Sequence, residues 1–187
     1  MQDQPIPGFI VTLPNIITLL RLVLVPTIVW LITIQRPVLA FWLFVMAGAG
    51  DALDGHLARK FDLRSRLGAL LDPLADKVLL VSLYVVLTIM SEIPTWLAYL
   101  VVSRDVLIVG AVVISWLVDR PLEMNPLVVS KINTAAQVAL AGVILADLAF
   151  AVDLAGLRMA LVGLVAALTV ASAAAYFANW VGYMNRF

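Results

Sequence analysis

The stretch GDALDGHLARKFDLRSRLGALLDPLADK, residues 50–77, places four aspartates against or inside apolar runs: Asp51, Asp54, Asp72 and Asp76. A charged side chain near the centre of a bilayer costs about 2.5–3.5 kcal/mol even on the most lenient insertion scale. Like charges held close together also repel one another. Such a cluster therefore needs a partner of opposite charge, and the rest of the sequence indicates which kind.

The composition of the chain is that of a membrane protein. Of its 187 residues, 64% are hydrophobic and only 13% are charged, and the mean hydropathy is +1.07. Soluble domains are about 45–50% apolar and about 25% charged. The net charge is zero, so no overall field points to nucleic acid. Cysteine is absent, which excludes disulfides, thiolate chemistry and cysteine-based zinc sites.

Six apolar segments are long enough to cross a bilayer, which takes about 20 residues. They cover residues 16–34, 38–58, 68–90, 94–118, 127–150 and 154–180. Charged or proline-containing breaks separate them, and no linker or repeat divides the chain. We predict an all-α integral membrane protein, a six-transmembrane-helix bundle that forms a single domain over residues 1–187, with residues 1–15 as an interfacial N-terminal segment.

Basic residues predict the orientation of this bundle. The loop after the second segment carries Arg59, Lys60, Arg64 and Arg66, and basic loops stay on the cytoplasmic side. Six spans then place both termini in the cytoplasm. The start of the chain has neither a basic region nor a small-residue cleavage site, so we expect no cleaved signal peptide.

The four aspartates form two pairs that each share a helix face. Asp51 and Asp54 are spaced i, i+3, and Asp72 and Asp76 are spaced i, i+4. A short loop joins their helices, so the pairs are expected to converge near the inner membrane boundary. Carboxylates are hard oxygen ligands that suit Mg²⁺, Mn²⁺ or Ca²⁺. Four of them can hold two such ions, an arrangement used in phosphoryl chemistry.

The residues between the two pairs suit a phosphate-bearing ligand. Gly55 and Gly68 leave the helix surface bare, so that a bulky ligand can approach the backbone. Arg59 offers a planar fork for a phosphate. Carboxylate pairs also occur in ion and proton transporters, so a small carboxylate-lined ion carrier is the alternative from another functional class. His56, the only histidine, is interpreted as a polar residue without a catalytic role.

Eight residues fit the pattern D-x2-D-G-x2-A-R-x8-G-x3-D-x3-D with every spacing intact. They are Asp51, Asp54, Gly55, Ala58, Arg59, Gly68, Asp72 and Asp76. This resembles the signature of the CDP-alcohol phosphatidyltransferase family. The resemblance implies six transmembrane helices, usually in a homodimer, and a reaction in which an alcohol attacks a CDP-linked lipid and CMP leaves.

The resemblance also implies roles for individual residues. The four aspartates would ligate two divalent ions, Mg²⁺ or Mn²⁺, and Asp76 would in addition take the proton of the alcohol. The residues expected to contact the CDP-lipid are Asn15, Thr18, Gly55, Ala58, Arg59, Ser65 and Gly68. For Asn15 the alternative is a capping role at the start of the first helix.

We expect the second half of the chain to bind the acceptor alcohol and so to determine which alcohol reacts. Arg104, Lys131 and Arg21 are the predicted acceptor contacts, and the alternative for Arg104 is a packing pair with Asp105. The segments LGALLDPLADKVLLVSLYVVLT, SRDVLIVG and SKINTAAQ are similar to the cardiolipin synthases of the mitochondrial type within the family. That similarity implies CDP-diacylglycerol and phosphatidylglycerol as substrates, with glycerol-3-phosphate as the alternative acceptor. We expect an integral protein of a bacterial inner membrane, with the active site near the cytoplasmic face.

Overall fold

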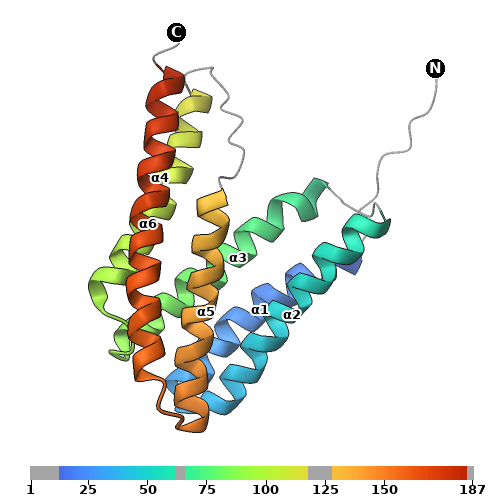
Figure 1. The fold of residues 1–187 in the computed structure, drawn as a ribbon. Helices are drawn as coiled ribbons and strands as arrows, with labels where there is room; N and C mark the ends of the chain where they lie inside the picture. The colour runs from blue at the N-terminus through green and yellow to red at the C-terminus, as the bar shows by residue number, and fades with distance from the viewer. Residues whose placement is uncertain (1–12, 62–65, 118–127, 185–187) are drawn as a thin grey trace, which may run out of the picture. The chain divides into compact units, whose positions relative to one another are not determined.

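The computed structural model describes residues 13–61, 66–117 and 128–184, which form six α-helices and no β-strand (Figure 1). The helices are α1 (Leu13–Thr33), α2 (Pro37–Phe61), α3 (Arg66–Ile89), α4 (Thr95–Leu117), α5 (Val128–Phe150) and α6 (Ala155–Met184). Each helix coincides within a few residues with one of the six predicted segments. The all-α prediction is therefore confirmed for the described residues.

The first helix begins earlier than the sequence predicts. Leu13, Pro14 and Asn15 belong to α1, although the predicted interfacial segment runs to residue 15. Proline is tolerated in a first helical turn because the N–H that it lacks would have no partner there. Asn15 therefore lies inside the first turn and not ahead of it. Residues 1–12 of the predicted interfacial segment lie outside the described residues.

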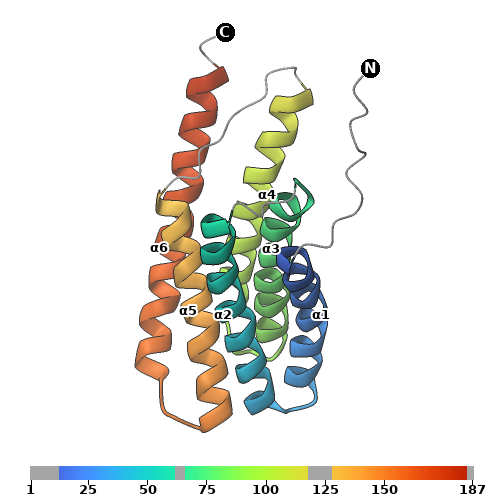
Figure 2. The same ribbon diagram turned by 90° about the vertical axis from the view of Figure 1, so that its right-hand side faces the viewer.

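The chain divides into two compact units, residues 1–82 and 83–187, and each is described by itself. In the first unit α1 packs against α2, and the two helices lie side by side in both views (Figures 1 and 2). The buried residues of these helices include Ile28 and Ile32 of α1 and Ala40 and Phe44 of α2. Ala40 is completely buried, and small residues of this kind let membrane helices approach closely.

In the second unit α4 and α5 both pack against α6. Residues 151–154 join α5 to α6, and Figure 2 shows these two helices side by side with their connection at one end. The last part of α3 contributes Leu83 and Leu87, which are completely buried, as are Leu140 and Ile144 of α5. The inward faces of α4, α5 and α6 also carry buried polar residues, among them Arg104, Asn133 and Ser172.

Three helices are followed, within two residues, by a residue with left-handed backbone conformation. Gln35, Ser91 and Ala151 have φ values of 58°, 62° and 50°. After α3, the N–H of Glu92 donates to the carbonyl of Leu87 at 2.8 Å, and that of Ser91 donates to Thr88. Paired bonds of this kind form the Schellman motif, which satisfies carbonyls that the helix itself leaves unpaired. The turns after α1, α3 and α5 are therefore closed locally by the backbone.

Two helices in the described part of the chain are long and apolar enough to cross a membrane, over Val128–Phe150 and Ala155–Gly182. Shorter apolar stretches occur at Leu22–Thr33, Pro37–Gly50 and Lys77–Ile89. The unit surfaces expose large apolar side chains, for example Met46 at 63% and Met159 at 77%. Apolar surface of this extent marks contact with lipid or with another protein.

A substitution at the end of α5 tests the left-handed cap. Ala151→Gly should raise the free energy of unfolding by about 0.5–1 kcal/mol, because glycine adopts positive φ without the penalty that alanine carries. Ala149→Gly, two residues earlier and inside the helix, is the matched control and should lower it by about 1 kcal/mol. Unfolding titrations in mixed micelles measure both. Equal destabilisation by the two variants would contradict the assigned cap.

Candidate functional site

The four predicted metal-binding aspartates lie on two helices that follow one another. Asp51 and Asp54 belong to α2, and Asp72 and Asp76 belong to α3. Because both segments are helical, the i, i+3 and i, i+4 spacings place each pair on one helix face. The side chains of all four lie outside the described part of the structure, so their convergence on two metal ions stays a prediction. Among the described side chains, no three metal-ligating residues cluster.

The residues predicted to contact the CDP-lipid also lie on helices. Gly55, Ala58 and Arg59 belong to α2, and Gly68 belongs to the first turn of α3. Asn15, Thr18 and Arg21 lie in the first half of α1, whereas Ser65 lies outside the described residues. Their side chains are not among those that the structure describes, and their roles stay predictions.

The best-defined polar site in the second unit surrounds Arg104 of α4, which is 2% exposed. Its Nη1 lies 2.5 Å from Oδ1 of Asp105. Its Nη2 donates to Oγ of Ser130 on α5 at 2.5 Å and to Oγ of Ser172 on α6 at 2.7 Å. Its Nε also donates to Ser172, at 3.2 Å. One guanidinium therefore joins three helices.

An aromatic ring completes the surroundings of this guanidinium. Cζ of Arg104 lies 5.8 Å from the centroid of the Tyr176 ring on α6, a distance at which a cation is attracted to the face of an aromatic ring. A buried charge is tolerated only where it is paired and hydrogen-bonded. Asp105, the two serine hydroxyls and the ring together meet that condition.

The Arg104–Asp105 pair was the alternative to a direct acceptor contact, and the structure contains that pair. Direct contact between Arg104 and an acceptor stays a prediction. Lys131, the second predicted acceptor contact, is exposed on α5. The sequence analysis did not identify Ser130, Ser172 or Tyr176 as partners. A signal for two of them was present, because residues 172 and 176 share a face of α6 at i, i+4 spacing.

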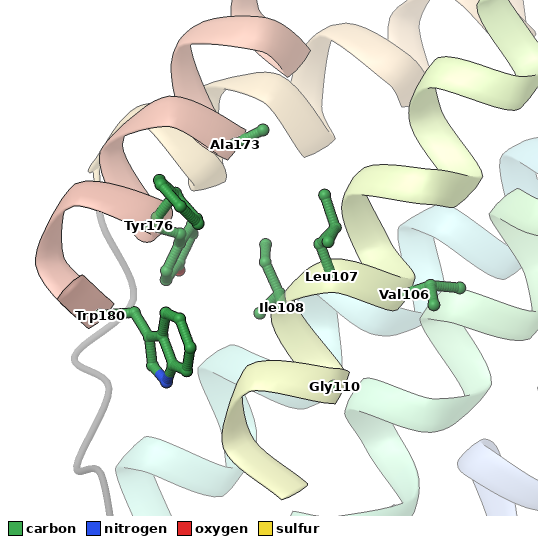
Figure 3. Close-up of a pocket in the computed structure, with 8 residues that line it drawn as sticks. Val106, Leu107, Ile108, Gly110, Ala173, Tyr176 and Trp180 are labelled. Carbon is green, nitrogen blue, oxygen red and sulfur yellow. The ribbon is translucent and has the colours of Figure 1, made fainter. Parts of the chain in front are cut away.

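A groove of about 300 Å³ lies beside the Tyr176 ring, between α4 and α6. Figure 3 shows Leu107 and Ile108 of α4 facing Tyr176 and Trp180 of α6 across it. Its lining is almost entirely apolar, so it suits a hydrocarbon chain and offers no charge to a phosphate. Polar and apolar surfaces thus meet at Tyr176.

Two further polar contacts hold the second unit together. Oγ1 of Thr169 on α6 donates to Oδ1 of Asn133 on α5 at 3.1 Å. Arg158 of α6 pairs with the carboxylate of Glu92 at 2.7 Å and also donates to its backbone carbonyl. The second contact is only partly buried, and it fixes the start of α6 to the turn after α3. We therefore assign it a structural role.

Comparison with known proteins identifies a family. Residues 11–180 match the sequence model of the CDP-alcohol phosphatidyltransferases. A cardiolipin synthase (CMP-forming)/mitochondrial hydrolase fusion protein of Schizosaccharomyces pombe is 36% identical over 93% of this chain and 32% of its own length. Human cardiolipin synthase (CMP-forming) is 37% identical over 72% of this chain and 50% of its own length.

A relative named for a different activity also matches. The chloroplastic CDP-diacylglycerol–glycerol-3-phosphate 3-phosphatidyltransferase 1 of Oryza sativa is 34% identical over 88% of this chain and 55% of its own length. The matched region thus spans between about a third and about half of the length of these curated relatives.

A double-mutant cycle tests the coupling between Arg104 and its neighbour. Arg104→Met should lower the free energy of unfolding by about 3–5 kcal/mol, because it removes the guanidinium that pairs with Asp105 and bonds to Ser130 and Ser172. The double variant Arg104→Met/Asp105→Leu should recover more than half of that loss. Ser103→Ala, an exposed neighbour whose hydroxyl bonds within its own helix, is the control and should change little. A double variant that recovers none of the stability lost in Arg104→Met would contradict the pairing.

Proposed function

This chain belongs to the CDP-alcohol phosphatidyltransferase family, and we propose that it acts as a cardiolipin synthase. In this proposal it transfers a phosphatidyl group from CDP-diacylglycerol to phosphatidylglycerol and releases CMP. The family match over residues 11–180 carries the proposal, because it contains all eight positions of the aspartate pattern. The cardiolipin synthases that are 36–37% identical to the chain support the choice of reaction.

The proposed mechanism assigns a task to each group of residues. The carboxylate of Asp76 takes the proton of the acceptor hydroxyl as its oxygen forms a bond to the phosphorus that carries the diacylglycerol. The bond between that phosphorus and the oxygen of CMP breaks, and CMP leaves. Arg59 holds a phosphate of the nucleotide, and Gly55 and Gly68 leave space for it. Asn15, Thr18, Ala58 and Ser65 are the remaining proposed contacts to the CDP-lipid.

The donor set suits two divalent cations. Asp51, Asp54, Asp72 and Asp76 offer only hard oxygen ligands, and the chain has no cysteine, which favours Mg²⁺ or Mn²⁺ over softer metals. When bound, the ions neutralise the pyrophosphate and stabilise negative charge on the departing CMP. Their attraction also offsets the mutual repulsion of four neighbouring carboxylates.

The choice of acceptor separates the proposal from its nearest alternative, a phosphatidylglycerophosphate synthase. Glycerol-3-phosphate carries a phosphate monoester with two negative charges. Its binding site needs cations whose charge is not already neutralised by a carboxylate. Of the predicted acceptor contacts, Arg104 has Asp105 at 2.5 Å, and Lys131 remains on the exposed face of α5. This charge balance favours phosphatidylglycerol, whose headgroup brings a single phosphodiester charge.

The proposal places the protein in a membrane as one domain of six transmembrane helices. The apolar lengths of α5 and α6 and the exposed apolar side chains on both units support the membrane setting. An inner bacterial membrane, a cytoplasmic active site and a homodimer complete the proposal, and these three rest on the positive loop and the family resemblance. Both substrates would reach the site from the lipid phase.

An acceptor screen tests the function. Purified protein with CDP-diacylglycerol and Mn²⁺ is offered phosphatidylglycerol, glycerol-3-phosphate, serine or inositol phosphate, and mass spectrometry identifies the products. We expect cardiolipin and CMP with phosphatidylglycerol, and a loss of rate of about 100-fold or more in Asp76→Asn, which lacks the proton acceptor.

Asp147→Asn, a change at a carboxylate on α5 far along the chain from the pattern, is the control and should retain activity. Phosphatidylglycerophosphate as the product would overturn the choice of acceptor. Absence of CMP with every acceptor, together with metal flux into proteoliposomes, would replace the enzyme by the ion carrier.

A further inference from the structure

A continuous row of polar residues runs along the contact between α5 and α6 in the second unit. We call it the polar seam, and it consists of Ser130, Asn133 and Gln137 of α5, Thr169 and Ser172 of α6, and Arg104 and Asp105 of α4. The α5 members are spaced i, i+3 and i, i+7, so they share the face that packs on α6. Hydrogen bonds cross the seam from Thr169 to Asn133 and from Arg104 to Ser130 and Ser172.

Two amides of the seam have hydrogen-bond donors without a partner. Nδ2 of Asn133 and Nε2 of Gln137 are buried and donate to no atom of the described structure. The two residues are 0% and 2% exposed. An unsatisfied amide is costly in any protein interior and more so in a membrane span, where no water of the bilayer core can substitute. Two such groups one turn apart on one helix face can therefore bind a hydrogen-bond acceptor that the described residues do not supply.

The α5 members of the seam become more exposed toward the N-terminal end of the helix. At the N-terminal end, Val128 is 70% exposed, Ser130 is half-buried and Lys131 is exposed. Directly beyond Gln137 the same face carries the completely buried apolar side chains of Leu140 and Ile144. A ligand would therefore enter beside Ser130, on the side that the sequence predicts to be cytoplasmic, and its polar end would stop at Gln137.

The charge of the seam indicates the class of ligand. Its two charged members, Arg104 and Asp105, are paired with each other, and the remaining five are uncharged. The unsatisfied groups are neutral N–H donors, which suit hydroxyl or ester oxygens. A phosphate monoester with two negative charges would need an additional cation inside the seam to offset its desolvation.

From these observations we infer that the polar seam binds the glycerol headgroup of the acceptor lipid through the amide N–H groups of Asn133 and Gln137. This inference rests on the proposed function and deepens it, because it locates the selection of the acceptor on α5 and α6. It makes the two amides specificity-determining residues that favour an uncharged polyol headgroup over a phosphate monoester. Arg104 acts as a positioning residue, which holds α5 against α6 through Ser130 and Ser172.

Substitutions that keep size and remove the donors test the inference. Gln137→Met and Asn133→Leu should each raise the KM for phosphatidylglycerol about tenfold, the effect of losing one hydrogen bond to a buried ligand. The KM for CDP-diacylglycerol and kcat should stay within about twofold of the wild type. Thr134→Val is the matched control, because its hydroxyl bonds only to the backbone of its own helix in the described structure, and it should leave all three constants unchanged.

A binding measurement without turnover separates the inference from the proposed function. Thermal unfolding is followed in phosphatidylethanolamine nanodiscs with and without phosphatidylglycerol, in the absence of CDP-diacylglycerol. We expect phosphatidylglycerol to raise the Tm of the wild type and of Thr134→Val but not that of Gln137→Met. Free glycerol-3-phosphate should raise none of them.

If the wild type makes no cardiolipin, the proposed function fails, and the Tm comparison alone then decides whether the seam binds this headgroup. A Gln137→Met variant with unchanged KM and an unchanged response to phosphatidylglycerol would overturn the inference, and the amide would then hold only a buried water molecule. Should Asn133→Leu fail to fold, because Thr169 loses its acceptor, Gln137→Met still decides the question.

Discussion

Polar groups inside apolar helices must find partners, and this constraint governs both halves of the chain. The Arg104 guanidinium meets it with a carboxylate, two hydroxyls and an aromatic ring drawn from three helices. Its partners come from segments 26 and 68 residues away along the chain. The carboxylate offsets the charge of the guanidinium within α4, and the hydrogen bonds to Ser130 and Ser172 tie α4 to α5 and α6.

The same constraint explains why the aspartate pattern belongs to a metal site in the proposed function. Four carboxylates in apolar helices cannot be satisfied by a few hydroxyls, and the nearby Arg59 and Lys77 can neutralise only part of their charge. Divalent ions supply the missing positive charge and at the same time give the site its chemistry. The unsatisfied amides of the polar seam would meet the same constraint, with the headgroup of the acceptor lipid as their hydrogen-bond partner.

The sequence was sufficient to predict the helices, because hydropathy and helix-breaking residues are local properties. Each of the six segments is a helix within a few residues of its predicted bounds, and the larger differences include the earlier start of α1 at Leu13 and the later end of α6 at Met184. The family was also predictable, since eight spaced residues identify it. The partners of Arg104 were not, because Ser130 and Ser172 are ordinary residues until tertiary packing brings them to the guanidinium. The unsatisfied amides of Asn133 and Gln137 were likewise visible only once neighbouring helices enclosed them.

The central claim is that the aspartates of α2 and α3 gather two divalent cations, and manganese binding measures this directly. Electron paramagnetic resonance of the purified protein, titrated with Mn²⁺ in the presence of CDP-diacylglycerol, counts the bound ions and detects magnetic coupling between them. The account predicts two coupled ions per chain in the wild type and their loss in Asp51→Asn and Asp72→Asn. A wild-type protein that binds no manganese at millimolar concentration, or binds it equally well without these aspartates, would contradict it.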